Sequence, residues 1–111
     1  MAAFYGAYLQ EHGGQPPPDE QAFRDFLAAK QPELETAGLS VDDMFISPRS
    51  PSSIQWIYGG ALPVGPSGME YFAYEQQPID NARLVIASRG IFDLMDESRF
   101  HEVFPNAPRA P

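Results

Sequence analysis

The chain contains no cysteine, so disulfide bonds, thiolate nucleophiles and cysteine-based metal sites are excluded. Histidine is nearly absent too, because only His12 and His101 occur and they stand at opposite ends of the chain. Zinc sites need several ligands at short fixed spacing, and neither H-x-x-x-H nor H-E-x-x-H is present. We therefore predict no metal site and expect both histidines to have capping, packing or surface roles.

Positive charge is scarce as well. The chain has 7 Lys and Arg against 15 Asp and Glu, which gives a formal net charge of -8. Such a surface repels phosphates, so nucleic acids and anionic membrane surfaces are poor candidates for partners. The acids cluster at 33–35, 42–43 and 93–97, without the spacing of a calcium loop. We expect them to serve as helix caps and as a solvated surface.

No apolar run approaches the roughly 18–20 residues that span a bilayer, and no signal-peptide pattern follows Met1. A helical pattern nevertheless starts within the first few residues, at Ala2-Ala3-Phe4-Tyr5. This abrupt start suggests that the chain is trimmed at its front, in which case any export signal or membrane anchor would lie upstream.

Motifs for catalysis are missing. The serines between 47 and 53 belong to no G-x-S-x-G turn, and no histidine is near them in sequence. The Gly- and Pro-rich segment 59–68 lacks the Lys-Ser/Thr ending of a phosphate-binding loop and connects two expected strands. We therefore predict a protein that is not an enzyme and has no cofactor.

Apolar side chains, by contrast, are plentiful. Hydrophobic residues make up 43% of the 111 residues, and they include 8 Phe, 5 Tyr and 1 Trp. This supply predicts a folded core rather than disorder. We expect one domain over residues 1–105, followed by a flexible tail at 106–111.

The first half of the chain shows helical periodicity. Residues 3–12 place an apolar and aromatic stripe at i, i+3, i+4 and i+7, and Gly13-Gly14 ends the pattern. A second helix is expected over 19–30 with Asp19 as its N-cap, extending through Leu34 to a stop at Gly38. Ser40-Val41-Asp42-Asp43 resembles a capping box for a further short turn.

The second half predicts strands over 53–58, 69–75, 83–88 and 91–95. Asp96 then caps a last helical turn that carries Phe100, Val103 and Phe104 and stops at Pro105. The expected fold is α+β, with N-terminal helices packed on a four-stranded antiparallel meander and a short C-terminal helical turn.

Arg89-Gly90 predicts a two-residue hairpin turn between the last two strands. That register pairs Ala87 with Phe92 and Val85 with Leu94, which makes one wholly apolar face that we expect to pack on a helix. The opposite face carries polar interruptions, so loop 59–68 covers part of it or it is left for a partner. Its members are Leu84, Ile86, Ser88, Ile91, Asp93 and Met95.

The strand aromatics allow two interpretations. Strands favour such residues for packing, and we expect this role for most of them. The alternative is a binding platform for a peptide or a carbohydrate. The candidate interaction surface, from these aromatics and the interrupted hairpin face, consists of Trp56, Tyr58, Tyr71, Tyr74, Leu84, Ile86, Ile91 and Met95.

The order of these elements resembles a known family. The helix Phe4-Tyr5-Gly6-Ala7-Tyr8-Leu9-Gln10-Glu11-His12-Gly13-Gly14 precedes a Pro-rich spacer, a second helix Asp19-Glu20-Gln21-Ala22-Phe23-Arg24-Asp25-Phe26-Leu27, a meander and a closing turn Asp96-Glu97-Ser98-Arg99-Phe100.

This arrangement is similar to the soluble portions of planctomycete-type secreted proteins related to prepilin-like and pseudopilin-like domains. The family's last hairpin commonly carries Asp-Gly where this chain has Arg89-Gly90. The resemblance implies a non-enzymatic extracytoplasmic domain that contacts other proteins. It also implies a membrane tether only through a missing N-terminal segment, and it is compatible with an oligomer.

Overall fold

The structure is a computed structural model that describes residues 2–47, 53–60, 62–65 and 68–105. Four helical segments come first: α1 (Ala2–Glu11), α2 (Glu20–Ala29), α3 (Gln31–Thr36) and the 3₁₀ turn η1 (Asp42–Phe45). The remaining elements are β1 (Ile54–Trp56), β2 (Tyr71–Glu75), β3 (Ala82–Ala87), the 3₁₀ turn η2 (Ser88–Gly90), β4 (Phe92–Asp96) and α4 (Glu97–Val103). The expected α+β fold is therefore confirmed.

The helices begin where the sequence places capping residues. The Asp19 side chain accepts a hydrogen bond from the Ala22 backbone N–H at 2.8 Å, which satisfies one free donor of the first turn of α2. Ser40 and Asp43 bond reciprocally, since each side chain accepts from the other's backbone N–H, as a capping box requires. The predicted cap at Asp96 is also present, because its carboxylate accepts from the Arg99 N–H.

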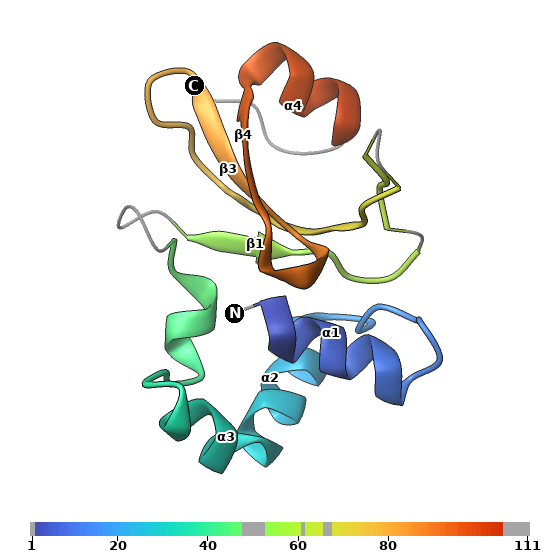
Figure 1. Ribbon diagram of the computed structural model, residues 1–111, viewed down its shortest axis with the longest axis vertical. Coiled ribbons are helices and arrows are strands. Elements are labelled where there is room, and N and C mark those ends of the chain that lie inside the picture. The colour runs from blue at the N-terminus through green and yellow to red at the C-terminus, as the bar shows by residue number, and fades with distance from the viewer. Residues whose placement is uncertain (1, 48–52, 61, 66–67, 106–111) are drawn as a thin grey trace.

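The four strands form one antiparallel sheet in the order β1-β2-β3-β4. In Figure 1 the N-terminal helices lie below the sheet and α4 lies above it, so the molecule has three layers. We call the side of the sheet that bears Trp56, Phe72 and Ile86 the N-helix face. The side that bears Tyr74, Val85 and Met95 is the α4 face.

Each face has its own core. On the N-helix face, Tyr5 of α1 stacks on Trp56 and meets Phe23 of α2 edge to face, with all three rings at most 1% exposed. On the α4 face, Phe100 of α4 packs edge to face on Tyr74 at 5.0 Å between ring centroids. Burial on both faces explains why every residue of β2 is buried.

A β-bulge in β2 shapes the N-helix face. The pairing between β2 and β3 shifts register between Tyr71 and Ala73. An extra residue at this point turns two neighbouring side chains, Phe72 and Ala73, toward the same core. Tyr71 before the bulge and Tyr74 after it both belong to the α4 face.

The predicted register of the last hairpin is wrong by one residue. Ile86 pairs with Phe92 and Leu84 with Leu94, whereas the prediction paired Val85 with Leu94. The turn has three residues because Ser88 leaves the strand, and Arg89 and Gly90 both take positive φ. The Ala87 N–H then donates to the Ile91 carbonyl and closes the loop.

This shift exchanges the two faces of β4 relative to β3, whereas Val85 and Ala87 of the predicted apolar face do pack against α4. A slip of one residue moves every side chain of a strand to the other side of the sheet. Phe92 and Leu94, which we expected to pack on a helix, are 52% and 57% exposed, and Ile86 is fully buried. The face with polar interruptions is itself divided, because Ile86 lies in the core beneath the N-terminal helices and Met95 in the core beneath α4. The Pro- and Ser-containing segment 48–52, residues 61 and 66–67 of the loop, and the predicted tail 106–111 lie outside the described residues.

Candidate functional site

The eight residues of the predicted interaction surface do not form one surface. Five are at most 7% exposed: Trp56, Tyr71, Tyr74, Ile86 and Met95. They are also divided between the two cores, since Trp56 and Ile86 belong to the N-helix face and the other three to the α4 face. The leading expectation, that most of the strand aromatics serve packing, is therefore confirmed for Trp56, Tyr71 and Tyr74, and burial rules these three out as members of an exposed platform. Tyr58 and Leu84 are partly buried, and Ile91 is the one of the eight that is exposed.

An exposed apolar surface lies instead on β3 and β4. Five large hydrophobic side chains of the described chain are exposed, and three of them lie within four residues of the hairpin arm: Ile91, Phe92 and Leu94. The register puts Phe92 and Leu94 on the same side as partly buried Leu84. We call Leu84, Phe92 and Leu94 the β4 surface.

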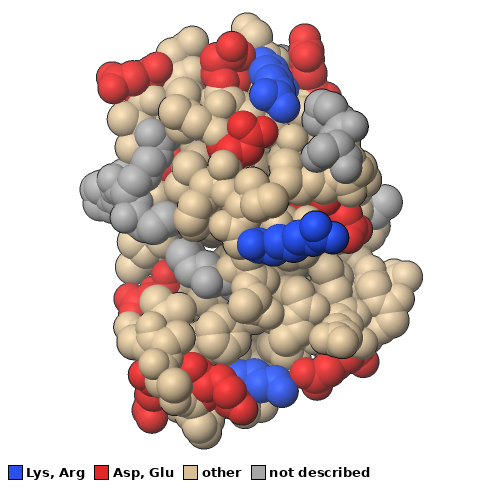
Figure 2. All heavy atoms as spheres, in the orientation of Figure 1, with Lys and Arg blue, Asp and Glu red and all other residues tan. Residues whose placement is uncertain are grey.

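The β4 surface continues the N-helix face beyond the helices that cover it. Ile86, paired with Phe92, is fully buried in the core beneath α1, whereas Phe92 itself is about half exposed. Figure 2 shows uncharged atoms over the lower part of β4, between acidic side chains toward α4 and a basic side chain toward α1. Exposed apolar side chains that adjoin one another, rimmed by polar groups, are typical of interaction sites.

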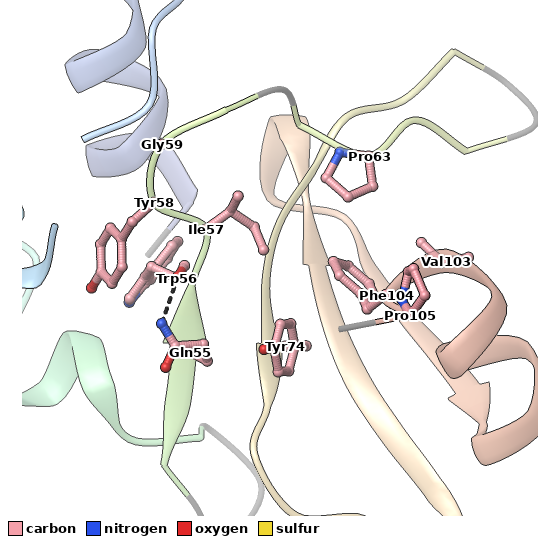
Figure 3. Close-up of a pocket in the computed structure, with 10 residues that line it drawn as sticks. All are labelled: Gln55, Trp56, Ile57, Tyr58, Gly59, Pro63, Tyr74, Val103, Phe104 and Pro105. Carbon is pink, nitrogen blue, oxygen red and sulfur yellow. Dashed lines mark hydrogen bonds between the residues drawn. The ribbon is translucent and has the colours of Figure 1, made fainter. Parts of the chain in front are cut away.

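A cleft opens at the other edge of the sheet, between β1 and the end of α4 (Figure 3). Its volume is about 400 Å³, which falls in the range of small-molecule sites. Ile57 and Phe104 supply opposite apolar walls, and Tyr74 lies between them. The rings of Trp56 and Tyr58 lie on the other side of the chain from Ile57, so they do not face Phe104 across the cleft.

The cleft has no charge among the residues that line it, and Gln55 is its main polar side chain. The amide Nε2 of Gln55 donates to the Trp56 carbonyl at 2.8 Å, and its Oε1 accepts from Gln76. Burial raises the pKa values of Tyr58 and Tyr74 above the ordinary phenol value, so neither ring carries charge in the cleft. The cleft therefore suits a small uncharged ligand.

Between β3 and α4 lies a polar cluster that sequence reasoning missed. Arg83 is fully buried, and its Nε donates to Glu97 Oε1 at 2.6 Å while its Nη2 donates to Oε2 at 3.3 Å. The guanidinium also donates to the carbonyls of Glu75 and Gln76 and lies over the Phe100 ring. These hydrogen bonds hold α4 against the sheet.

The Glu97 carboxylate has a second neighbour, because His101 Nε2 lies 3.2 Å from its Oε2. The hydrogen bonds from Arg83 lower the pKa of Glu97 below its usual range, with a smaller contribution from His101. The Nδ1 atom of His101 is buried and has no hydrogen-bond partner among the described residues. With Arg83 inaccessible and Glu97 only 17% exposed, the cluster is suited to holding structure rather than to meeting a substrate.

Two further buried polar groups, Glu75 and Ser47, join β2 to the end of the helical half. Ser47 Oγ donates to Glu75 Oε2 at 2.7 Å, and the Leu84 backbone N–H donates to Oε1 at 2.6 Å. The Glu75 carboxylate thereby accepts hydrogen bonds from two separate segments of the chain, in keeping with the rule that buried polar side chains are hydrogen-bonded. Its role is structural as well.

The described residues contain no group of three or more His, Asp or Glu side chains arranged to bind a metal ion. Over the same part of the chain, no helix has both the length and the apolar character needed to cross a membrane. His12, as expected, has a local role, since its ring stacks on Tyr8 and its Nδ1 lies 2.9 Å from the Tyr8 carbonyl.

A signal for part of the polar cluster was present in the sequence. Arg83 alternates with Val85 and Ala87, and strand periodicity puts all three on one buried face. A charged residue in such a position requires a partner. Phe92 and Leu94 were missed because their exposure depends on the hairpin register.

Comparison of the chain with family models, with curated proteins and with solved structures finds no match.

Proposed function

We propose that this chain is a non-enzymatic protein-interaction domain that binds a partner protein through the β4 surface. The observation that carries the proposal is the exposure of Phe92 and Leu94, two large apolar side chains on the same side of the edge strand. Burying apolar surface contributes roughly 25 cal/mol per Å², so a partner that covers both side chains gains binding free energy.

The other notable side chains of the described chain have structural roles, which supports placing the partner site on the β4 surface. The polar cluster around Arg83 and Glu97 is engaged in holding α4, and the aromatic rings are buried in the two cores. A half-exposed phenylalanine beside a half-exposed leucine has no such structural use. Phe92 and Leu94 lie on β4, the last strand of the sheet, so another molecule can approach the outer side of this strand.

The test is site-specific photo-crosslinking followed by a binding measurement with a purified partner. A photoreactive residue at position 92 should capture a protein that the same residue at position 46 does not. Ile46 is a matched control because its side chain is 46% exposed and it bridges to Ser53 next to β1, at the opposite edge of the sheet. The captured protein is then produced separately for calorimetry.

In calorimetry, Leu94→Lys should weaken binding of the purified partner about tenfold or more, which corresponds to about 1.4 kcal/mol, and Ile46→Lys should leave it unchanged. Equal weakening by both variants would show that the β4 surface is not the binding site. Trp56 fluorescence provides a check that each variant keeps the native core, since the indole is buried and donates to the Met44 carbonyl.

The cleft of Figure 3 supports a second candidate function, the binding of a small uncharged ligand between Ile57, Tyr74 and Phe104. The test is an NMR titration with neutral aromatic and sugar fragments. Shifts confined to these residues, abolished by Phe104→Ala in a variant that keeps its fold, would favour the cleft. Fragments that shift no cleft residue would count against it.

The pseudopilin-like character of the domain and its extracytoplasmic location are also part of the proposal. They are supported by the helix-first order and by the packing of Tyr5 and Leu9 of α1 against the sheet layer. The test is fractionation of cells that express the complete gene product. Recovery in the cytoplasmic fraction alone would contradict the location without affecting the β4 surface.

A further inference from the structure

β4 has a free edge. It is the last strand in the order β1-β2-β3-β4, and no described residue pairs with its outer side. The Ala87 N–H donates to the Ile91 carbonyl, and the Glu97 N–H donates to the Asn81 carbonyl, so the odd-numbered residues of β4 bond toward β3. In an antiparallel pair this direction alternates along the strand. The backbone N–H and C=O groups of Phe92 and Leu94 therefore point outward.

The two edges of the sheet differ. At β1, the Gln55 side chain donates to the Trp56 carbonyl, and Ile46 forms a bridge with Ser53. At β4, the sequence Phe92-Asp93-Leu94-Met95-Asp96 contains neither proline nor lysine, and its pairing with β3 runs through five residues without a bulge. Proteins commonly protect edge strands with proline, lysine or bulges, and of the protecting devices β4 has only its acidic side chains, which oppose acidic partners but not basic ones. In β4, the two residues whose backbone groups point outward, Phe92 and Leu94, are thus also the two whose apolar side chains are exposed.

We infer that β4 receives an extended segment of a partner protein as a fifth, antiparallel strand of the sheet. This inference rests on the proposed function and specifies how the β4 surface binds. Main-chain hydrogen bonds form with Phe92 and Leu94, and alternate apolar side chains of the segment pack beside theirs.

The acidic residues on β4 indicate which side chains the bound segment should carry. Asp96 lies on the same side of the strand as Leu94 and is exposed, and Asp93 is 26% exposed with Arg99 3.5 Å away. The whole chain carries a net charge of -8. A segment with the order basic-x-apolar-x-apolar places its cation beside Asp96 and its apolar residues beside Leu94 and Phe92.

A second copy of this chain fits the edge less well. Antiparallel pairing of two β4 strands centred on Leu94 would set Asp96 of each copy opposite Phe92 of the other. It would also gather four aspartates at one junction between two acidic molecules. Two molecules that each carry a net charge of -8 repel one another, so the edge favours a basic partner over self-pairing.

The experiment is an NMR titration of the complete chain with a short capped peptide, Lys-Thr-Val-Thr-Val-Thr-Lys. We expect shifts and slowed hydrogen exchange at the Phe92 and Leu94 amides. A peptide with Glu in place of both Lys should bind about tenfold more weakly, because opposite charges across strands are replaced by like ones.

Methylated peptides separate strand addition from simple apolar contact. In the expected register the Val residues lie opposite Phe92 and Leu94, so N-methylation of both Val should abolish binding while N-methylation of two Thr should not. Equal binding by the two methylated peptides would overturn strand addition and leave the β4 surface as a side-chain contact site. Absence of any change at Phe92 and Leu94 with the basic peptide would overturn the inference, whatever photo-crosslinking shows for the proposed function.

Two protein variants complete the test. Leu94→Thr keeps the backbone and should reduce the affinity for the basic peptide about threefold or more through lost packing. The matched control Ile46→Thr should leave it unchanged. Concentration-dependent pairing of the chain with itself through β4, in preference to the basic peptide, would contradict the partner chemistry.

Discussion

Arg83 and Glu97 show how much depends on single residues in this molecule. The Arg83 guanidinium has no exposed surface, and the Glu97 carboxylate and the carbonyls of Glu75 and Gln76 accept hydrogen bonds from it. Removing one member of a buried ion pair generally destabilises a fold. The stability of the α4 layer should therefore depend on the charge of Glu97.

We expect Glu97→Gln to lower the free energy of unfolding by about 2–3 kcal/mol at neutral pH, the range for hydrogen bonds to charged groups. Because Arg83 lowers the pKa of Glu97 in the folded state, the stabilisation is present above the ordinary carboxyl pKa. It is lost as the pH falls through the lowered value. Urea unfolding followed by Trp56 fluorescence should show a gap between the two proteins that narrows on acidification.

Glu102→Gln is the matched control, since Glu102 is an exposed acid on the same helix. It should change stability by less than about 0.5 kcal/mol, as surface substitutions generally do. A gap for Glu97→Gln that stays constant from neutral to acid pH would show that charge is not the cause.

Tyrosine ionisation gives a second prediction at this scale. Burial raises the pKa values of Tyr5, Tyr58, Tyr71 and Tyr74. An ultraviolet titration should therefore ionise fewer tyrosines near about pH 10 in the folded protein than in urea. Superimposable titration curves in the two states would contradict the burial of these phenols.

At the scale of elements, the last hairpin and α4 decide which side chains are buried. Phe92 and Phe100 lie only eight positions apart in sequence, yet Phe92 is 52% exposed and Phe100 is fully buried. The difference arises from the three-residue turn Ser88–Gly90, which sets Phe92 on the side away from α4.

We expect Phe100→Ala to destabilise the fold by about 3–5 kcal/mol and Phe92→Ala by less than about 1 kcal/mol. Thermal or urea unfolding of the two variants measures this difference with identical chemistry at both sites. The reverse order of stabilities would favour the register that the sequence predicted over the one in the structure.

Local signals were sufficient to predict the elements. Asp19, the Ser40–Asp43 box and Asp96 mark the helix starts, and each cap makes the hydrogen bond that its residue type predicts. The hairpin register could not be predicted in the same way. Arg89 and Gly90 take positive φ, as the two-residue turn would also require, so these residues do not reveal that Ser88 joins the turn and lengthens it to three residues.

The candidate site was harder to predict than the fold for the same reason. Exposure of Phe92 and Leu94 follows from one residue of register, and burial of Arg83 follows from the position of α4. Both the exposure of Phe92 and Leu94 and the burial of Arg83 depend on how the elements pack together, not on the local sequence. The alternation of Arg83 with Val85 and Ala87 was the one local pattern that pointed to a buried ion pair.

At the scale of the whole molecule, the excess of acids acts on association. We expect that replacing Asp93 and Asp96 together by Asn raises self-association through the free edge, because two charges that oppose strand pairing are removed. Asparagine still caps helices, so α4 should be retained. Sedimentation at low ionic strength measures the change.

The control is the double variant Asp25→Asn and Asp80→Asn, which changes the net charge equally at exposed positions away from β4. Asparagine also tolerates the positive φ of Asp80. If both double variants associate to the same extent, net charge alone controls association and the edge has no special part in it.

The difference between the β1 and β4 edges should also limit the size of an assembly that forms by strand addition. A sheet with two open margins can propagate without end, as amyloid does. Here one margin is closed by Gln55 and by the Ile46–Ser53 bridge, and the other is open. If a partner segment adds to β4 as inferred above, we expect it to form a one-to-one complex that cannot grow further into a fibre.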